Sequence, residues 1–203
     1  MKNIYFFSSC QYSVSGFSAL IGGISENSIR VIPIKDSWEI LDNINFDTQQ
    51  KSSIIVVDMT YYERSLIVIS LWFLWNLSVL YSEGKISSKI PCIVLGCNGV
   101  LDKKIYPFAR ICPSQPVNKL KSIIIEALTT PSNNFTKPSK FRRLNSKERY
   151  VVNSSLNGMP LKEIAANMKI TDRKANYYRY SAIKKIGLQK QYEYALLMGK
   201  IFL

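Results

Sequence analysis

The sequence predicts an α/β domain followed by an all-α domain, and three observations support this fold class. In residues 1–130, short apolar segments alternate about five times with helical ones, which is typical of a doubly wound parallel sheet. Residues 131–143 are polar, contain two prolines and end in basic residues, as linkers do. Residues 144–203 carry helix-start and helix-stop signals at short intervals. We therefore expect an α/β domain over 1–130, a linker over 131–143 and a four-helix domain over 144–203.

The hydrophobic pattern assigns the elements of the first 130 residues. Apolar runs bounded by polar or turn residues predict strands at residues 4–9, 29–34, 53–59, 90–96 and 110–112. The third run, SIIVVDM, is almost continuously apolar, as strands in the middle of a parallel sheet are. Helices are predicted at 14–21, 37–44, 65–81 and 117–129. We expect Ser37 to cap the second helix. The last helix is amphipathic, with an apolar side formed by Leu120, Ile123, Ile124 and Leu128.

Residues 65–81 (SLIVISLWFLWNLSVLY) form the most apolar segment and allow three interpretations. Their length is near the lower limit for crossing a bilayer, but Asn76 and three serines interrupt the run. Charged residues close both ends: Glu63, Arg64, Glu83 and Lys85. We interpret the segment as a buried helix of a soluble domain. The alternatives are a membrane span, or a helix whose Trp72 and Trp75, three residues apart, form a dimer contact.

The last third contains clear signals for short helices. Asn145 and Glu148 have the spacing of a capping box, in which each side chain binds the backbone amide of the other residue. Gly158 is expected to end that helix, and Pro160 suits the first turn of the next one. That second helix has an apolar stripe made of Leu161, Ile164, Ala165 and Met168.

A third helix is predicted over 172–186, capped by Thr171 and ended by Gly187. A fourth segment, 189–197, contributes Tyr192 and Leu196 to close the bundle. Two short helices joined by a tight turn, the second of them basic, predict a helix-turn-helix.

The composition excludes several classes of site. The chain has no histidine, so it contains no Ser-His-Asp or Cys-His site and no HExxH zinc helix. Its four cysteines form no CxxC pair, and we expect them to be small buried hydrophobic residues in a reducing cytosol: Cys10, Cys92, Cys97 and Cys112. We predict no catalytic residue, no metal site and no cofactor. An enzyme is therefore the weakest alternative for this chain.

The positive charge is concentrated in the last third of the chain. The formal net charge is +13, of which residues 131–203 carry 15 Lys+Arg against 4 Asp+Glu. A compact basic domain attached to a nearly neutral one indicates a polyanionic partner, most often nucleic acid.

Residues 144–188 resemble the helix-turn-helix of LuxR/NarL-type (FixJ-like) bacterial transcription regulators, without a gap. The matching features are Glu148, Val151, Gly158, the block Lys162 to Ala165, Met168, Ile170, Thr171 and the block Lys185 to Leu188. The sequence departs from the family at Lys174-Ala175, where Thr-Val is usual, and at Tyr178, where histidine is usual. These departures affect the DNA sequence that is read and leave the binding mode unchanged.

The resemblance implies that the third helix enters the major groove of double-stranded DNA. Carried over by position, the base-facing residues are Asn176, Tyr177 and Tyr180, whose amide, hydroxyl and ring suit base edges and thymine methyl groups. The implied phosphate contacts are Thr171, Arg173, Lys174, Lys184 and Lys185. We expect Ala175, Ala182 and Ile186 to pack inward. The alternative for Tyr177, Tyr178 and Tyr180 is an aromatic packing cluster, with Tyr178 the most buried.

The first 130 residues resemble a receiver domain whose phosphorylation pocket is incomplete. Asp58 ends the third predicted strand, at the position of the phosphorylated aspartate of receivers. Where receivers have a pair of acids, a Ser or Thr, and a Lys, this chain reads Ser8-Ser9-Cys10, Gly96-Cys97-Asn98 and Cys112-Pro113-Ser114. A single carboxylate holds Mg²⁺ poorly, so we interpret Asp58 as a vestigial position that takes no phosphate.

This layout is similar to enteric auxiliary regulators of the RcsA/BglJ kind. It implies a cytoplasmic transcription regulator that acts as a homodimer, or as a heterodimer with another receiver-type regulator, and that recruits or blocks RNA polymerase. The alternatives are a protein-interaction auxiliary with little DNA binding of its own, and a membrane-associated regulator.

Overall fold

The computed structural model describes residues 2–22, 29–46, 53–60, 63–87, 89–96, 106, 108–112, 114–129, 143–188 and 193–195. Its strands are β1 (Lys2–Phe7), β2 (Ile29–Ile34), β3 (Ser53–Asp58), β4 (Cys92–Leu95) and β5 (Ala109–Ile111). They form one parallel sheet in the order β2-β1-β3-β4-β5. This is the strand order of the flavodoxin-like doubly wound fold, so the predicted doubly wound parallel sheet is confirmed.

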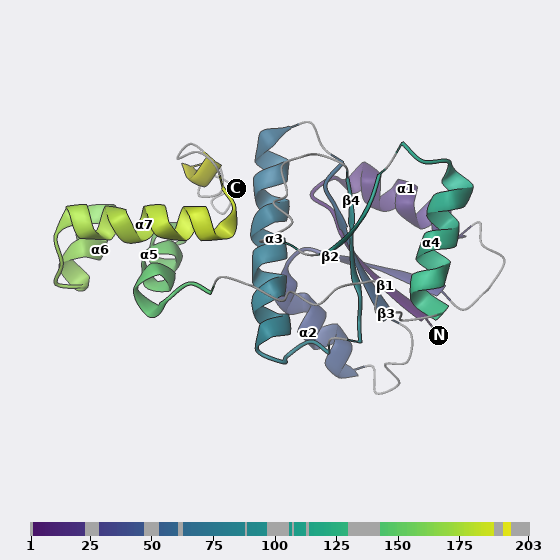
Figure 1. The fold of residues 1–203 in the computed structure, drawn as a ribbon, viewed down its shortest axis with the longest axis horizontal. Helices are drawn as coiled ribbons and strands as arrows, with labels where there is room; N and C mark the ends of the chain where they lie inside the picture. The colour runs from purple at the N-terminus through teal and green to yellow at the C-terminus, as the bar shows by residue number, and fades with distance from the viewer. Residues whose placement is uncertain are drawn as a thin grey trace.

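Four helices cover the two faces of the sheet (Figure 1). These helices are α1 (Gln11–Gly22), α2 (Ser37–Phe46), α3 (Arg64–Ser82) and α4 (Val117–Thr129). Side chains alternate along the strands, so Ile4 and Phe6 join the cluster beneath α1 and α4. Tyr5 and Phe7 join the cluster beneath α2 and α3. All six residues of β3 are buried, which explains why its sequence is nearly continuously apolar.

The helical part consists of α5 (Ser146–Leu156), α6 (Leu161–Asn167) and α7 (Asp172–Ile186), which pack against one another. The predicted capping box is present, since Glu148 N donates to Asn145 Oδ1 and Asn145 N donates to Glu148 Oε2, each at 2.8 Å. Gly158 and Gly187 follow α5 and α7 with φ of 82° and 87°, the left-handed conformation expected of helix-stop glycines. Of the predicted fourth helix, residues 193–195 are described and are helical; Tyr192 and Leu196 lie outside the described residues.

Most element boundaries agree with the hydrophobic pattern, and one cap does not. The bounds of β2 and α4 are as predicted, and the other elements of the sheet part differ by a few residues at their ends. Ser37 was expected to cap α2, but Asp36 does so: its Oδ1 accepts from Trp38 N at 2.7 Å and Glu39 N at 3.0 Å. Ser37 is instead the first helical residue and is buried.

The cysteines behave differently from one another. Cys92 is buried and free, as expected. Cys10 is free but only half-buried, and Cys112 is half-buried and disulfide-bonded, so the expectation of four buried thiols is wrong for these two. Both residues lie beyond the carboxyl end of a strand, Cys10 after β1 and Cys112 after β5, where the chain leaves the buried sheet. Cys97 lies outside the described residues.

The apolar helix α3 is buried from more than one side. By length and composition it is the one helix among the described residues that could cross a membrane, and 61% of its 18-residue window is buried inside the protein. Val68, Leu71 and Leu74 belong to the core beneath the sheet, which also contains Val152, Ile183 and Ile186 of the helical part. The interpretation of this segment as a buried helix is therefore confirmed.

The helical part contacts the sheet part through the C-terminal end of α7, which meets α3 (Figure 1). Tyr106, a buried residue between β4 and β5, donates a hydrogen bond from its hydroxyl to the carbonyl of Ile186, the last residue of α7. The same hydroxyl lies 3.3 Å from the carbonyl oxygen of Leu71 in α3. In addition, Arg143 donates to the carbonyl of Ser82 at 2.7 Å. The Tyr106 bond fixes the end of α7 against the sheet part, and the Arg143 bond fixes the chain before α5 to the end of α3.

Candidate nucleic-acid interface

The third helix of the helical part, α7, has one buried face and one exposed face. Thr171 caps it, because Thr171 Oγ1 accepts from Lys174 N at 3.3 Å. Ala175, Ala182 and Ile186 are fully buried against α5 and α6, as predicted. The exposed positions lie on the other side of α7.

The exposed face of α7 carries the residues that the sequence assigned to DNA. Tyr177 and Tyr180 are 67% and 51% exposed, which is unusual for aromatic residues and excludes the alternative of a buried aromatic cluster for both. The other exposed residues with an assigned role are Thr171, Arg173, Lys174, Asn176 and Lys184. Arg173, Tyr177, Tyr180 and Lys184 follow one another at helical spacing, so they share one face of α7.

Two contacts within this face hold its side chains in place. Arg179 donates to Asn176 Oδ1 at 2.7 Å, and Lys184 Nζ lies 5.1 Å from the ring centre of Tyr180. Arg179 thus orients the Asn176 amide so that its NH₂ group remains available as a donor. The sequence analysis missed Arg179, although its place three residues after Asn176 puts both side chains on the same turn of the helix.

Tyr178 lies at the side of this face and is half-buried. Its ring meets that of Tyr177 edge to face, with centroids 5.8 Å apart, and Lys147 Nζ lies 5.9 Å from its centre. Tyr178 was expected to be the most buried of the three tyrosines, and it is. Lys147 at the start of α5 is a second basic residue beside α7 that the sequence analysis did not assign.

Lys185 does not lie with the other basic residues of α7. Its Nζ is 2.6 Å from Glu148 Oε2 and 3.4 Å from the carbonyl oxygen of Arg143. Ser181 donates to the other oxygen of the same carboxylate at 2.7 Å. Burial raises the pKa of Glu148, but the hydrogen bonds from Lys185, Ser181 and the Asn145 amide outweigh it, so the pKa is lowered. In this arrangement the half-buried Lys185 joins α7 to α5.

The turn between α6 and α7 is closed without a glycine. Lys169 has a φ of 51°, the single non-glycine residue in the described part of the chain with positive φ. Lys169 N donates to Ala166 O, and Ile170 N donates to Ala165 O, each at 3.0 Å. These bonds satisfy the last carbonyls of α6 and set the angle at which α7 begins.

Asp58 lies at the carboxyl end of β3, as predicted, and is 2% exposed. Its Oδ1 accepts from the amide of Thr60 at 3.0 Å and the hydroxyl of Thr60 at 2.7 Å, and its Oδ2 accepts from Ser8 Oγ at 3.1 Å. Neutral donors therefore satisfy both carboxylate oxygens. Among the described residues, no three acidic, cysteine or histidine side chains are grouped so that they could hold a metal ion.

No family model and no curated protein matches this chain. Among solved structures, full-length FixJ from B. japonicum is 15% identical with a TM-score of 0.41, covering 99% of this chain and 97% of that one. The RcsB response regulator of Salmonella typhimurium is 16% identical with a TM-score of 0.40, and both chains are fully covered. RcsB from Salmonella enterica serovar Typhimurium bound to promoter P1flhDC is 14% identical with a TM-score of 0.43, covering 100% and 99%. At these identities and scores, the function has to be argued from the residues of this chain.

Proposed function

We propose that this chain is a sequence-specific DNA-binding transcription regulator that places α7 in the major groove. The observation that carries the proposal is the exposed face of α7, where two uncovered tyrosines, an oriented asparagine and several basic side chains lie together. An α-helix fits the major groove, and these side-chain types suit base edges and phosphates. The N-terminal end of α7, where this face begins, lies away from the sheet part (Figure 1), which leaves room for a duplex.

The residues of this face divide into two roles. Asn176, Tyr177 and Tyr180 read base edges, and Arg179 holds Asn176 for that purpose. Thr171, Arg173, Lys174 and Lys184 bind phosphates and fix the register of the helix on the duplex. Lys185 has a structural role instead, because Glu148 already holds its ammonium group.

The sheet part acts in association and is not switched by phosphorylation. Asp58 is buried and satisfied by Ser8 and Thr60, and it is the one carboxylate of this pocket among the described residues. A phosphoryl group and its Mg²⁺ need more oxygen ligands than this arrangement supplies. A single helix-turn-helix buries little DNA surface, so the regulator works as a homodimer or together with another receiver-type regulator. It acts in the cytoplasm, where it recruits or blocks RNA polymerase.

Fluorescence anisotropy with a pool of genomic duplexes tests the proposal. The full chain is compared with an Arg173→Ala/Lys174→Ala variant and with a Lys119→Ala/Lys121→Ala control, which removes the same charge from α4. We expect salt-dependent binding by the full chain and the control, and at least tenfold weaker binding by the α7 variant. Equal binding by both variants would place the DNA contact elsewhere on the protein.

The phosphorylation claim has a separate test. The chain is incubated with acetyl phosphate or with beryllofluoride and Mg²⁺, and intact-mass and NMR spectra are recorded. We expect neither phosphorylation nor beryllofluoride-dependent shifts at Asp58. A phosphoryl adduct that disappears in Asp58→Asn would refute the vestigial assignment.

A further inference from the structure

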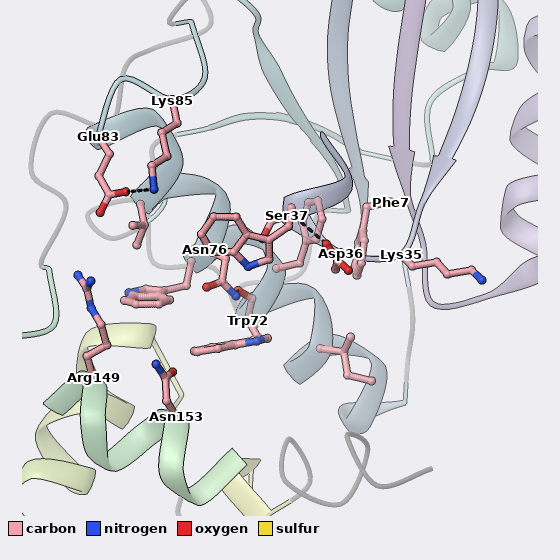
Figure 2. Close-up of a pocket in the computed structure, with 15 residues that line it drawn as sticks. Phe7, Lys35, Asp36, Ser37, Trp72, Asn76, Glu83, Lys85, Arg149 and Asn153 are labelled. Atoms are coloured by element: carbon pink, nitrogen blue, oxygen red, sulfur yellow. Dashed lines mark hydrogen bonds and ion pairs between the residues drawn. The ribbon is translucent and has the colours of Figure 1, made fainter. Parts of the chain in front are cut away.

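A cleft of about 430 Å³ lies where α2 and α3 of the sheet part face α5 of the helical part (Figure 2). This volume falls within the range of small-molecule sites, which extends from about 300 to about 1,000 Å³. From α5, Arg149 and Asn153 line the cleft, and no residue of α7 takes part in it. Its lining combines aromatic rings with side chains of both charges, the basic ones in excess.

Three tryptophans line the cleft. Trp72 and Trp75 of α3 are stacked, with ring centroids 5.2 Å apart and an angle of 13° between the ring planes. Trp75 is buried, whereas Trp72 is half-buried and shows its ring to the cleft. Trp38 of α2 is 54% exposed, and Lys85 Nζ lies 5.4 Å from its ring centre, over one face. A chain that leaves two indole rings open in one cleft offers flat surfaces on which a planar ring can stack.

The lining of the cleft has three basic and two acidic side chains, so its formal charge is positive by one. Glu83 is paired with Lys85 at 3.0 Å, and Asp36 is occupied in capping α2. Lys35 and Arg149 are also lining residues, and within the described part of the chain neither has an ion-pair partner. Figure 2 shows Arg149 and Asn153 extending from α5 toward the cleft that Trp72 also lines. A guanidinium group beside aromatic rings favours a ligand that carries an anionic group.

We propose that this cleft binds a small planar aromatic molecule carrying one anionic group. Its ring stacks on Trp72, its anionic group pairs with Arg149, and the Asn153 amide adds a hydrogen bond. Because Trp72 belongs to the sheet part and Arg149 to the helical part, the bound molecule joins the two parts. The required chemistry is met by an aromatic carboxylate and by a mononucleotide.

Isothermal titration calorimetry with two matched pairs of probes tests this site on the full chain. The first pair is indole-3-acetate and its neutral amide, and the second is AMP and adenosine. We expect at least one anion to bind at least tenfold more tightly than its neutral counterpart. Binding confined to the first pair would identify a carboxylate ligand, and binding confined to the second would identify a nucleotide. No binding by either anion, or equal binding of anion and neutral molecule, would overturn the proposal.

Variants assign the two roles within the site. Arg149→Gln, at an exposed position, should abolish the preference for the anion and retain the weak binding of the neutral ring. Trp72→Ala should weaken both members of the pair at least tenfold, and Trp72→Leu, which keeps apolar bulk without the ring, provides a second test of stacking should Trp72→Ala unfold the chain. Lys119→Ala on α4 is the control and should change nothing. An unchanged preference in Arg149→Gln would contradict the proposal, whatever the outcome of the DNA-binding test.

Discussion

Glu148 is the residue that joins the beginning of α5 to the end of α7. Its carboxylate accepts hydrogen bonds from Asn145 N, Ser181 Oγ and Lys185 Nζ, at 2.6–2.8 Å. The capping box was predictable, because Asn145 and Glu148 are close in sequence. The bonds to Ser181 and Lys185 were not, because no local pattern shows which lysine of a basic helix turns inward. The sequence therefore indicates that Glu148 caps α5, but it does not indicate that Glu148 binds α7.

The lowered pKa of Glu148 predicts a dependence of stability on pH. The folded state holds the carboxyl ionised below its ordinary pKa of 4.5, so the unfolded chain takes up the proton first as the pH falls. The stabilisation is complete above about pH 5. It is lost as the pH falls below the pKa of Glu148 in the unfolded chain and then through its lower pKa in the folded protein. Glu148→Gln should lower the free energy of unfolding by about 2 kcal/mol at pH 7 and by progressively less at lower pH. Urea unfolding between pH 7 and pH 3 measures this, with exposed Glu163→Gln as control; parallel pH profiles for Glu148→Gln and the parent chain would contradict the prediction.

Lys184 and Lys185 are adjacent, yet the structure predicts opposite consequences for their loss. Lys184→Ala should weaken binding to all duplexes and lower the salt dependence by about one unit in the log–log slope, with little change in stability. Lys185→Ala leaves the buried Glu148 carboxylate without its cation and should lower the free energy of unfolding by about 2–3 kcal/mol. Anisotropy titrations and urea unfolding of the two variants distinguish them. A reversal of the two effects would mean that Lys185 faces the duplex.

At the scale of elements, glycine predicted the left-handed helix ends correctly, but a helix end without glycine can be left-handed too. Gly158 and Gly187 mark the ends of α5 and α7, as their sequence positions predicted. The end of α6 adopts the same left-handed geometry at Lys169, where the sequence gives no sign of it. Left-handed backbone costs a residue with a side chain about 1–2 kcal/mol, so this turn is maintained by its hydrogen bonds and by the packing of Ile164 and Ala165.

Lys169→Gly should therefore stabilise the helical part. Glycine adopts positive φ without steric cost, and we expect the free energy of unfolding to rise by about 0.5–1 kcal/mol. Lys162→Gly is the matched control, because Lys162 is an exposed lysine inside α6, and it should lower stability by about 1 kcal/mol. Thermal and urea unfolding measure both variants. A loss of stability in Lys169→Gly would show that the lysine side chain supports the turn.

At the scale of the whole molecule, the order of the parts was predictable and their contact was not. Hydrophobic periodicity located the sheet elements and the helix-turn-helix. It could not distinguish whether the outer side of α3 meets lipid, a second copy or another part of the same chain, because all three favour the same apolar side chains. In the structure α3 meets both the sheet and α7, and Tyr106 bonds to the carbonyl groups of both helices. Tyr106, Leu71 and Ile186 are far apart in the sequence, so no local pattern could indicate these bonds.

Tyr106→Phe tests this contact. Burial raises the pKa of the Tyr106 hydroxyl, so it stays protonated and donates across the ordinary pH range. Its removal leaves the Ile186 carbonyl unpaired, and we expect the free energy of unfolding to fall by about 1–2 kcal/mol. Small-angle X-ray scattering should also show a larger radius of gyration as the two parts separate. Tyr12→Phe, at an 89% exposed position, should change neither quantity. An unchanged stability and radius in Tyr106→Phe would mean that apolar packing alone holds the parts together.

The two-sided burial of α3 determines how this chain can be divided for experiments. Cutting it near residue 130 removes the cover from Trp72, Leu71 and the neighbouring apolar side chains, and a fragment ending there would present them to water. We expect such a fragment to self-associate or precipitate on purification, even though its sheet is intact. The helical fragment would lose the Tyr106 hydroxyl that binds the end of α7. It would also expose the apolar side chains that pack against α3 in the intact protein. Each piece would therefore present, beside its own surface, an apolar one that the intact protein keeps covered.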